Sequence, residues 1–279
     1  MICKPKSYLK INDSINLGGF LLNDEVYIEP LIIDKTYLAF KSSISKNNII
    51  YKLVDYINSV LFALNQEVLD FISKYYKTFN LITDPNYTYP LELKQILTLN
   101  EKKELESFRS KVNLEFEILN LAHIFRNSPE LFIPVRLDYR GRIYCNVEYL
   151  HYQSVELAKS LLQFAKGAIV HIDDEVSIKY LKIFGANCYG NTLDKMSFND
   201  RINWIDKNKK NIINFENGKL ILKADNKLLF ITFCFEYNKY LNVINNNQDT
   251  FITHLPIQLD ASCNGFQHLS LLLEDTTLA

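Results

Sequence analysis

Hydrophobic residues recur at intervals of three and four positions from residue 48 to residue 72, and this spacing predicts one long amphipathic helix. The apolar positions of that helix are Ile50, Leu53, Val54, Ile57, Val60, Leu61, Leu64, Val68 and Ile72. The polar run TDPNYTYP at residues 83–90 breaks the pattern, because Pro and Asn favour turns. A second helix, which ends before Asn127, is predicted beyond this run. Its apolar face consists of Leu105, Phe108, Val112, Phe116 and Leu119. Two antiparallel helices joined by a loop would form an arm.

The pattern is typical of β-structure at two other places. Residues 1–45 contain short apolar segments separated by glycine and proline turns. Residues 131–138 and 142–149 alternate as strands do, and they flank a turn at residues 139–141. We therefore expect a hairpin in the middle of the chain.

Helical periodicity returns after this hairpin. Ser154 is a suitable N-cap for a helix at residues 155–165, and Gly167 is a suitable stop. Further helices are predicted at residues 175–189, 197–213 and 228–241, and a strand at residues 254–259. Ser197 and Asp200 form a capping box at the start of the middle helix. Many helices with a few strands predict a mainly helical α+β fold.

Composition mainly excludes classes of protein. A chain of 279 residues with 48% hydrophobic residues can bury a large core, in one domain or two. The net charge of −1 supplies no global basic field, so any nucleic-acid surface has to be local. Five cysteines without a CxxC pair indicate neither a zinc site nor a disulfide framework. The most apolar window, residues 228–235, covers about a third of a membrane span, so we expect a soluble protein without membrane contact.

Two short motifs could carry chemistry. Asp260 ends the apolar run HLPIQLD and precedes a glycine-containing turn, where a carboxylate could hold a divalent cation. Arg140 and Arg142 bracket Gly141, and forked guanidiniums match phosphate while glycine lets the backbone approach a polyanion. Taken singly, each pattern has a plainer interpretation. Asp260 would cap a helix, the arginines would be solvated turn residues, and Lys195 in LDKMSF would be a surface lysine.

The order of six segments favours the functional interpretation. They are DYRGRIY, QSVELAKSLL, LKIFGANCYG, LDKMSF, FCFEY and LDASCNGFQHLS. In these segments the chain resembles the single-subunit RNA polymerases of phages, mitochondria and linear mitochondrial plasmids. The resemblance is strong from residue 110 to residue 273 and looser upstream. The abundance of Asn, Ile, Lys, Tyr and Phe, which AT-rich codons encode, suggests the genome of an organelle, an organellar plasmid or a phage, and we expect a mitochondrial protein.

The resemblance implies DNA-templated RNA synthesis from ribonucleoside triphosphates with Mg²⁺. Asp260 matches the first catalytic aspartate of the family, and the carbonyl of Ala261 would complete its share of the metal ligands. Two such metal ions activate the attacking 3′-hydroxyl and neutralise the leaving pyrophosphate. The family more often has glycine at position 261, but an added Cβ is not expected to prevent metal binding. Lys195 matches the lysine that reaches the incoming triphosphate, a role that suits a compact ammonium.

Other matched residues imply contacts with nucleic acid. The residues that would grip the DNA template and the RNA–DNA hybrid are Arg140, Gly141, Arg142, Gln153 and Lys159. The spacing between Arg142 and Gln153 is one residue longer than in the phage enzymes, which affects the match of Gln153 more than that of Lys159. The residues that would shape the floor under the primer terminus are Gly265, Gln267 and His268. For His268, a core position that orients the loop is equally open.

The resemblance also implies the domain organisation of part of a right-hand polymerase. The expected parts are residues 1–46 as the end of an N-terminal domain, 47–128 as a helical thumb, 129–167 as the first part of the palm, 168–250 as a helical palm insertion and 251–279 as the second part of the palm. In the family, a fingers helix and a second catalytic aspartate follow the Asp260 motif, and this sequence carries neither. We therefore expect a truncated polymerase that is inactive alone and whose candidate partner is a separate C-terminal half.

Other classes of function stay open. A non-catalytic nucleic-acid-binding remnant would use Arg140 and Arg142 but not Asp260, and hybrid binding across a salt series tests it. A metal-dependent hydrolase would use Asp260 and His268, but it leaves DYRGR and LDKMSF without a role. Template-dependent DNA polymerases share the two-metal chemistry, but their corresponding motif usually carries a glutamate where the DASCNG loop lies.

Overall fold

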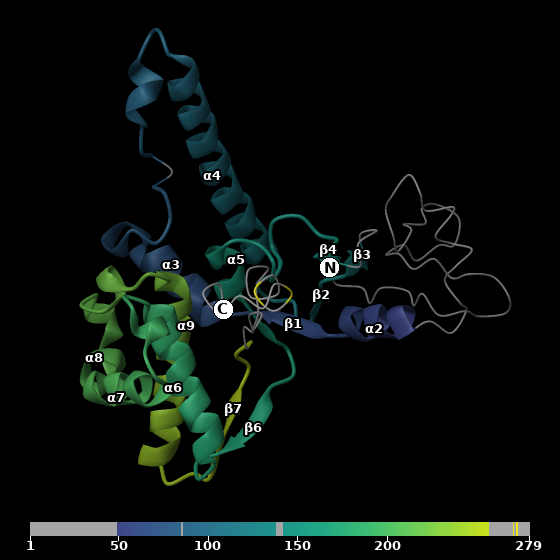
Figure 1. Cartoon of the computed structure of the whole chain (residues 1–279), viewed down its shortest axis with the longest axis vertical. Helices are drawn as coiled ribbons and strands as arrows, with labels where there is room; N and C mark the ends of the chain where they lie inside the picture. The colour runs from purple at the N-terminus through teal and green to yellow at the C-terminus, as the bar shows by residue number, and fades with distance from the viewer. Residues whose placement is uncertain (1–48, 85, 138–141, 257–269, 271, 273–279) are drawn as a thin grey trace, which may run out of the picture.

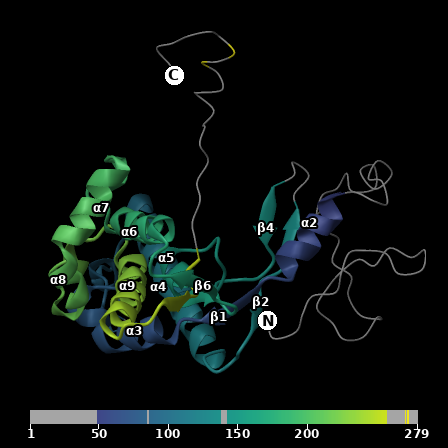
Figure 2. The ribbon, with the colours of Figure 1, turned by 90° about the horizontal axis from the view of Figure 1, so that it is seen from below.

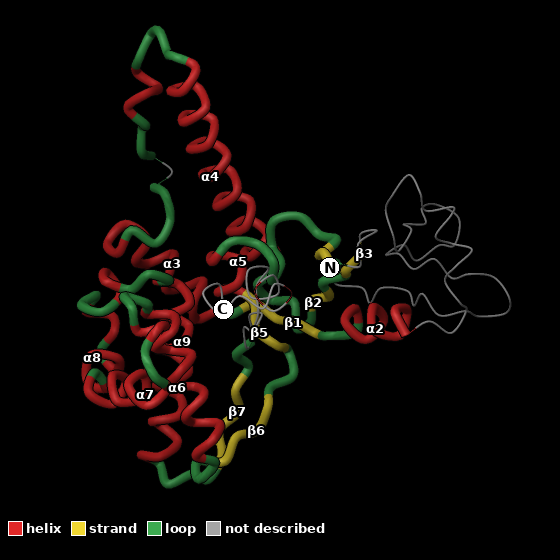
Figure 3. The backbone as a smooth tube through the Cα atoms, viewed as in Figure 1, coloured by secondary structure: helices red, strands yellow, loops and turns green. Residues whose placement is uncertain are grey.

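The computed structural model describes residues 49–84, 86–137, 142–256, 270 and 272. In these ranges the chain forms mainly helices, with three small antiparallel sheets of two or three strands (Figure 1, Figure 3). The prediction of a mainly helical α+β fold is confirmed. The strands predicted within residues 1–45 lie outside the described ranges. No described helix is both long and apolar enough to cross a membrane.

The elements are named as in Figure 1. The helices are α2 (Ile49–Asn58), α3 (Gln66–Phe79), η1 (Pro90–Leu93), α4 (Leu99–Ile124), α5 (Glu156–Leu161), α6 (Glu175–Tyr189), η2 (Leu193–Lys195), α7 (Phe198–Lys207), α8 (Lys209–Ile213), η3 (Phe215–Asn217), η4 (Ile221–Lys223) and α9 (Lys227–Asn245). The strands are β1 (Leu61–Leu64), β2 (Leu131–Phe132), β3 (Val135–Leu137), β4 (Ile143–Cys145), β5 (Leu162–Phe164), β6 (Ala168–His171) and β7 (Thr250–Thr253).

A helical body is built around α9, which packs against α3, α5, α6 and α8 (Figure 2). Phe230, Phe233 and Tyr237 of α9 are almost completely buried in the core. The close approach of α6 depends on Gly185, because a Cβ at that position would lie 2.4 Å from the ring of Phe233. Full burial of a side chain such as Phe230 or Phe233 contributes about 1.5–3 kcal/mol to the free energy of folding. The packing around α9 is therefore a main source of the stability of the body.

The single long helix predicted from residue 48 to residue 72 is wrong, because strand β1 interrupts it. β1 pairs antiparallel with β2 on one edge and with β5 on the other. Asn65 then caps α3, and its side chain accepts a hydrogen bond from the N–H of Val68 at 3.2 Å. The apolar residues of β1 suit a helix or a strand. They form a strand here because β2 and β5, one on each side, pair with the backbone N–H and carbonyl groups of β1.

β3 and β4 form the two sides of the predicted hairpin, with Val135 opposite Cys145 in the register. The first side is shorter than predicted because Pro134, which has no N–H to donate, separates β2 from β3. The predicted turn at residues 139–141 lies outside the described ranges. The second side is also shorter than predicted, because the strand predicted at residues 142–149 ends at Cys145. The pairing of the two strands is confirmed, and their predicted extent is wrong.

An arm projects from the body, and it consists of α4 and the segment between α3 and α4, which contains η1 (Figure 1). The carboxylate of Glu115 accepts a hydrogen bond from the N–H of Thr83 at 2.8 Å. The rings of Tyr89 and Phe108 stack with centroids 4.3 Å apart. These contacts hold the segment that contains η1 against α4. The prediction of an arm made of two antiparallel helices is wrong, because α3 packs on α5 and α9 in the body.

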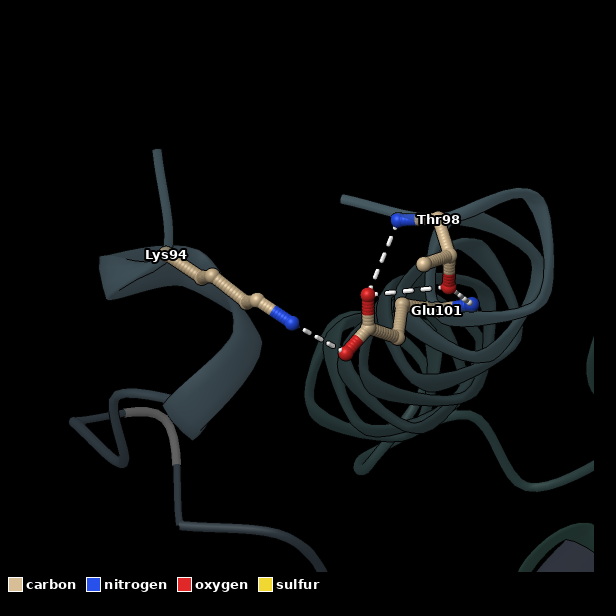
Figure 4. A network of polar contacts seen from close by, with 3 residues as sticks. All are labelled: Lys94, Thr98 and Glu101. Carbon is tan, nitrogen blue, oxygen red and sulfur yellow. Dashed lines mark hydrogen bonds and ion pairs between the residues drawn. The ribbon is translucent and has the colours of Figure 1, made fainter. Parts of the chain in front are cut away.

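A capping box begins the arm helix α4 (Figure 4). Thr98 Oγ1 accepts a hydrogen bond from the N–H of Glu101 at 3.3 Å, and the Glu101 carboxylate accepts one from the N–H of Thr98 at 2.8 Å. The ammonium of Lys94 lies 2.5 Å from the same carboxylate. The hydrogen bonds from Lys94 and then Thr98 lower the pKa of Glu101 to about 2. This end of the arm is therefore held by a carboxylate that stays charged at neutral pH.

Two of the three later helix predictions are confirmed, and the third is confirmed in place but not as one helix. α6 covers residues 175–189 as predicted, and α9 contains the predicted helix at residues 228–241. The predicted helix at residues 197–213 is divided into α7 and α8 at Asn208. Ser197 caps α7 as predicted, because its hydroxyl accepts the N–H of Asp200 at 3.2 Å. The reciprocal half of the predicted capping box differs, because the Asp200 carboxylate accepts from the Ser197 hydroxyl at 2.6 Å and not from its backbone N–H.

Two further predictions are wrong in their extent. The helix predicted at residues 155–165 ends at Leu161, because the next three residues form β5 and complete the sheet around β1. Its N-cap is Val155 rather than Ser154. The strand predicted at residues 254–259 is not found in its described part. β7 lies just before it and pairs with β6, and Pro256 has no N–H with which to continue the ladder.

Candidate functional site

Seven of the candidate site residues lie outside the described part of the chain. They are Arg140, Gly141, Asp260, Ala261, Gly265, Gln267 and His268. Their roles stay predictions. The structure describes the other four candidates, which are Arg142, Gln153, Lys159 and Lys195.

Gln153 binds the backbone of β4 with both ends of its side-chain amide. Its Oε1 accepts a hydrogen bond from the N–H of Cys145 at 2.7 Å, and its Nε2 donates to the carbonyl of Ile143 at 2.9 Å. A carbonyl and the N–H two residues later point to the same edge of a strand, so the amide takes the place of a neighbouring strand. The exposed Arg142 directly precedes β4. Gln153 therefore holds the edge of the hairpin that carries the DYRGR motif.

Glu156, one helical turn before Lys159 on α5, caps the N-terminus of α9. Its Oε1 accepts hydrogen bonds from the N–H groups of Leu228 at 2.7 Å and Leu229 at 3.1 Å. The N-cap residue of α9 makes no such bond with its own side chain. Burial raises the pKa of Glu156, while the two N–H groups and two nearby lysines, one of them Lys159, oppose this shift. The half-buried Lys159 thus lies beside the junction of α5 and α9.

Lys195 ends the short helix η2, which follows a left-handed turn. Gly190, Asn191 and Thr192 have φ angles of 70°, 51° and 72°. Asp225 holds this turn, since its Oδ2 accepts a hydrogen bond from the N–H of Asn191 at 2.6 Å. A Cβ at Gly190 would lie 2.0 Å from that oxygen, so both the φ angle and the close approach require glycine. Lys195 is exposed, and no residue that the structure describes pairs with its ammonium.

Contacts between the end of α6 and the start of α9 connect the turn before Lys195 with the junction of α5 and α9. The N–H of Asp225 donates to the carbonyl of Tyr189 at 2.9 Å, and the N–H of Asn226 donates to the carbonyl of Cys188 at 3.1 Å. α9 begins directly after this crossing, where Glu156 caps it. A continuous series of contacts therefore runs from the turn before Lys195 to the helix that carries Lys159.

These contacts hold the backbone near two cationic side chains. Lys159 and Lys195 can each neutralise charge on a phosphate as compact point charges. Within the described ranges, no group of three or more His, Cys, Asp or Glu residues could hold a metal ion. The predicted ligands Asp260 and Ala261 lie outside those ranges, so the Mg²⁺ site stays a prediction.

Sequence reasoning missed the residues that hold the candidates in place. Glu156 lies in the matched segment QSVELAKSLL, but the Leu228 N–H that it binds is 72 positions away. Asp225 lies in a stretch that no motif marks, 34 positions from Asn191. No local spacing indicates such pairs, because only the packing of α5, α6 and α9 brings them together.

Comparison with known proteins points to one class. The family described as DNA-dependent RNA polymerase matches residues 172–279. A probable DNA-directed RNA polymerase of Podospora anserina is 50% identical over 283 residues, which cover 100% of this chain and 29% of the relative. T7 RNA polymerase of Escherichia phage T7 is 34% identical over 169 residues, or 59% of this chain and 18% of the relative. A mitochondrial DNA-directed RNA polymerase of Neurospora crassa is 33% identical over 190 residues, or 66% of this chain and 13% of the relative.

These similarities assign the chain to one class of protein, the DNA-directed RNA polymerases. The chain belongs to the family of single-subunit DNA-directed RNA polymerases of the phage and mitochondrial type. The resemblance seen in the six segments is therefore confirmed. The chain spans less than a third of the length of the first curated relatives that it matches.

Proposed function

We propose that this chain forms part of the active site of a polymerase that joins ribonucleoside triphosphates on a DNA template. The observation that carries the proposal is the 50% identity over the whole chain to a probable DNA-directed RNA polymerase. A local feature supports it. Lys195 is exposed beside a turn that Asp225 braces, and a residue that meets each incoming triphosphate needs such a fixed position.

Each candidate residue has one role in this proposal. Asp260 and Ala261 bind metal, and Lys195 binds the triphosphate of the incoming nucleotide. Arg142, Lys159 and the adjacent Arg140 and Gly141 contact the template and the RNA–DNA hybrid. Gln153 serves the same contacts by holding β4. The residues that shape the active site beneath the primer terminus are Gly265, Gln267 and His268.

Magnesium is the cofactor in this proposal. Bound Mg²⁺ would activate the 3′-hydroxyl of the primer and neutralise charge on the pyrophosphate. The carboxylate of Asp260 and the carbonyl of Ala261 are oxygen ligands of the kind that Mg²⁺ prefers.

The proposal extends to the organisation of the chain as part of a right-hand polymerase. The end of an N-terminal domain would occupy residues 1–46, and α4 would belong to a thumb at residues 47–128. The hairpin β3–β4 would belong to the first palm segment at residues 129–167, and α6 to α9 to an insertion at residues 168–250. Residues 251–279 would be the second palm segment. One relative is mitochondrial by name, and we propose a mitochondrial location for this protein, with an organelle or a plasmid as the source of its gene.

Binding of an RNA–DNA hybrid by the purified chain tests the nucleic-acid contacts. We expect Arg142→Ala to weaken binding and to lower the slope of log affinity against log salt by about 0.7–0.9. Arg109→Ala is the matched control, because it removes the same charge from the arm, where Arg109 pairs with Glu92 at 3.1 Å. If Arg142→Ala leaves affinity and slope unchanged, or changes them only as much as the control does, the hairpin does not bind the hybrid.

Primer extension tests the reaction itself. The purified chain is mixed with a hybrid primer–template, ribonucleoside triphosphates and Mg²⁺, and we expect no extension. The reason is that the first relatives carry more than two thirds of their length outside the matched segment. In a polypeptide of the relatives' length we expect extension, and Asp260→Asn to abolish it while hybrid binding persists. Templated, Mg²⁺-dependent extension by the chain alone would overturn the first expectation, and extension by the Asp260→Asn polypeptide the second.

A further inference from the structure

Arg201, on the first turns of α7, binds the backbone on both sides of Lys195. Its Nη2 donates to the carbonyl of Asp194 at 2.6 Å, and its Nε donates to the carbonyl of Met196 at 3.0 Å. Its Nη1 donates to Oδ1 of Asn187 on α6 at 2.8 Å. One guanidinium therefore ties the residues before and after Lys195 to the preceding helix.

The chemistry of arginine suits this arrangement. The guanidinium is planar, stays charged, and directs its N–H groups in a fixed fork, so a bond to one carbonyl orients the bond to the other. The ring of Phe198 lies 5.1 Å from the guanidinium carbon and adds a cation–π contact. With three nitrogens of Arg201 bound to protein oxygens, the side chain is committed to the loop.

The loop that carries Lys195 is thus held at both ends. Asp225 holds the left-handed turn before it, and Arg201 holds the backbone around it. Between these two anchors the N–H of Lys195 donates to the carbonyl of Thr192 at 3.1 Å, and the N–H of Met196 to the carbonyl of Leu193 at 3.0 Å. The side chain of Lys195 itself remains exposed.

We propose that Arg201 is a positioning residue, which fixes the backbone on both sides of Lys195 so that its ammonium meets the triphosphate of the incoming nucleotide in one orientation. This inference rests on the proposed role of Lys195. It adds that Arg201 acts through the loop and does not bind the nucleotide. A charge at position 201 is therefore not sufficient, and the fork of the guanidinium is required.

Amide hydrogen exchange tests the local part of the inference without any nucleotide. In Arg201→Ala we expect the amides of Lys195 and Met196 to exchange about tenfold faster, because charge-assisted hydrogen bonds to the neighbouring carbonyls are lost. Lys182→Ala is the matched control, since it breaks the ion pair between Lys182 and Asp206 that joins α6 and α7 elsewhere, at 2.7 Å. Unchanged exchange in Arg201→Ala, or equal acceleration in the control, overturns the inference.

Affinity labelling of the same chain tests the functional part. The probe is a ribonucleoside triphosphate with an aldehyde on its terminal phosphate. The aldehyde condenses with a lysine amine, water leaves, and borohydride reduces the imine. Peptide mass spectrometry compares labelling at Lys195 with labelling at the exposed Lys219. We expect selective labelling of Lys195, about a tenfold loss in Arg201→Ala, and the same loss in Arg201→Lys.

The outcomes separate the two proposals. If the unsubstituted chain shows no selective labelling of Lys195, the triphosphate role of Lys195 is overturned, and the functional part of the inference falls with it. If Lys195 is labelled but Arg201→Lys restores full labelling, position 201 supplies only charge, and the positioning role is overturned. Selective labelling that both substitutions weaken, together with faster exchange of the loop amides, supports the inference.

Discussion

Replacement of Glu156 by alanine should destabilise the helical body, because this carboxylate caps a helix that starts 71 positions later. Its Oε1 accepts hydrogen bonds from the N–H groups of Leu228 and Leu229. Asn226, the N-cap residue of α9, makes no capping bond with its own side chain. Loss of an N-cap costs about 0.5–2 kcal/mol, and loss of a charge at a helix N-terminus about 0.3–1 kcal/mol. Relief of the burial that raises the pKa of Glu156 offsets part of this cost. We expect a net loss of about 1–2 kcal/mol at neutral pH.

Glu156→Gln separates the cap from the charge. The amide oxygen can still accept both N–H groups, and a neutral group avoids the cost of burying a carboxylate, so we expect a change below about 1 kcal/mol. Glu175→Ala is the control, because Glu175 also lies in the first turn of a helix but its side chain is 81% exposed. We expect that control to change stability by less than about 0.5 kcal/mol. Urea unfolding followed by circular dichroism measures all three variants.

The pH dependence of the same variants has a definite sign. Burial raises the pKa of Glu156 above its ordinary value of 4.5, so the folded chain binds the proton more tightly than the unfolded chain. Relative to Glu156→Gln, the unsubstituted chain should therefore gain stability as the pH falls through the raised pKa toward 4.5. A loss over this window would show that the helix N-terminus outweighs burial. An alanine variant as stable as the Glu175→Ala control would refute the capping argument altogether.

Three further predictions address the core, the arm and the hairpin. Gly185→Ala should cost about 1–2 kcal/mol in thermal unfolding, because overpacking against Phe233 exceeds the gain of about 1 kcal/mol in helix propensity, and a more stable variant would contradict the close packing of α6 and α9. The pKa of Glu101 is lowered to about 2, so the contribution of this carboxylate to the stability of the arm should be complete above pH 4.5, its ordinary pKa, and vanish as the pH falls to about 2. Nuclear magnetic resonance can follow the titration, and a midpoint near 4.5 would disprove the network in Figure 4. Gln153→Ala should accelerate exchange of the Cys145 amide about tenfold, and unaltered protection of this amide would mean that β4 is held without the side chain of Gln153.

Much of the fold could be predicted from periodicity because the helices of the body are long and strongly patterned. The helix at residues 175–189 is predicted to the residue, and Ser197 caps its helix as expected. The failures occur at short apolar segments. Leu61–Leu64 suits a helix and a strand equally, and the outcome depends on strands that come 67 to 103 positions later.

The candidate site divides in the same way. Lys195, Arg142 and the other candidates are marked by short motifs in a fixed order, which a sequence displays directly. The groups that hold them carry no such mark. Arg201 binds backbone carbonyl oxygens, which every residue possesses, so no motif in the sequence marks its partners. Its role depends on how α7 lies against the loop that carries Lys195. Gln153 carries a motif assignment, yet its observed partners are backbone atoms of β4.

The sequence by itself determined the family of this protein, the residue types available for its chemistry and the position of its long helices, because these follow from local pattern and motif order. Only the tertiary structure decided which short segments become strands, that α3 belongs to the body and not to the arm, and which side chains brace Lys195 and α9. The physical reason is that these outcomes depend on contacts between separate segments, most of which lie far apart in the sequence. A local pattern can predict that such contacts are needed, but only packing supplies them.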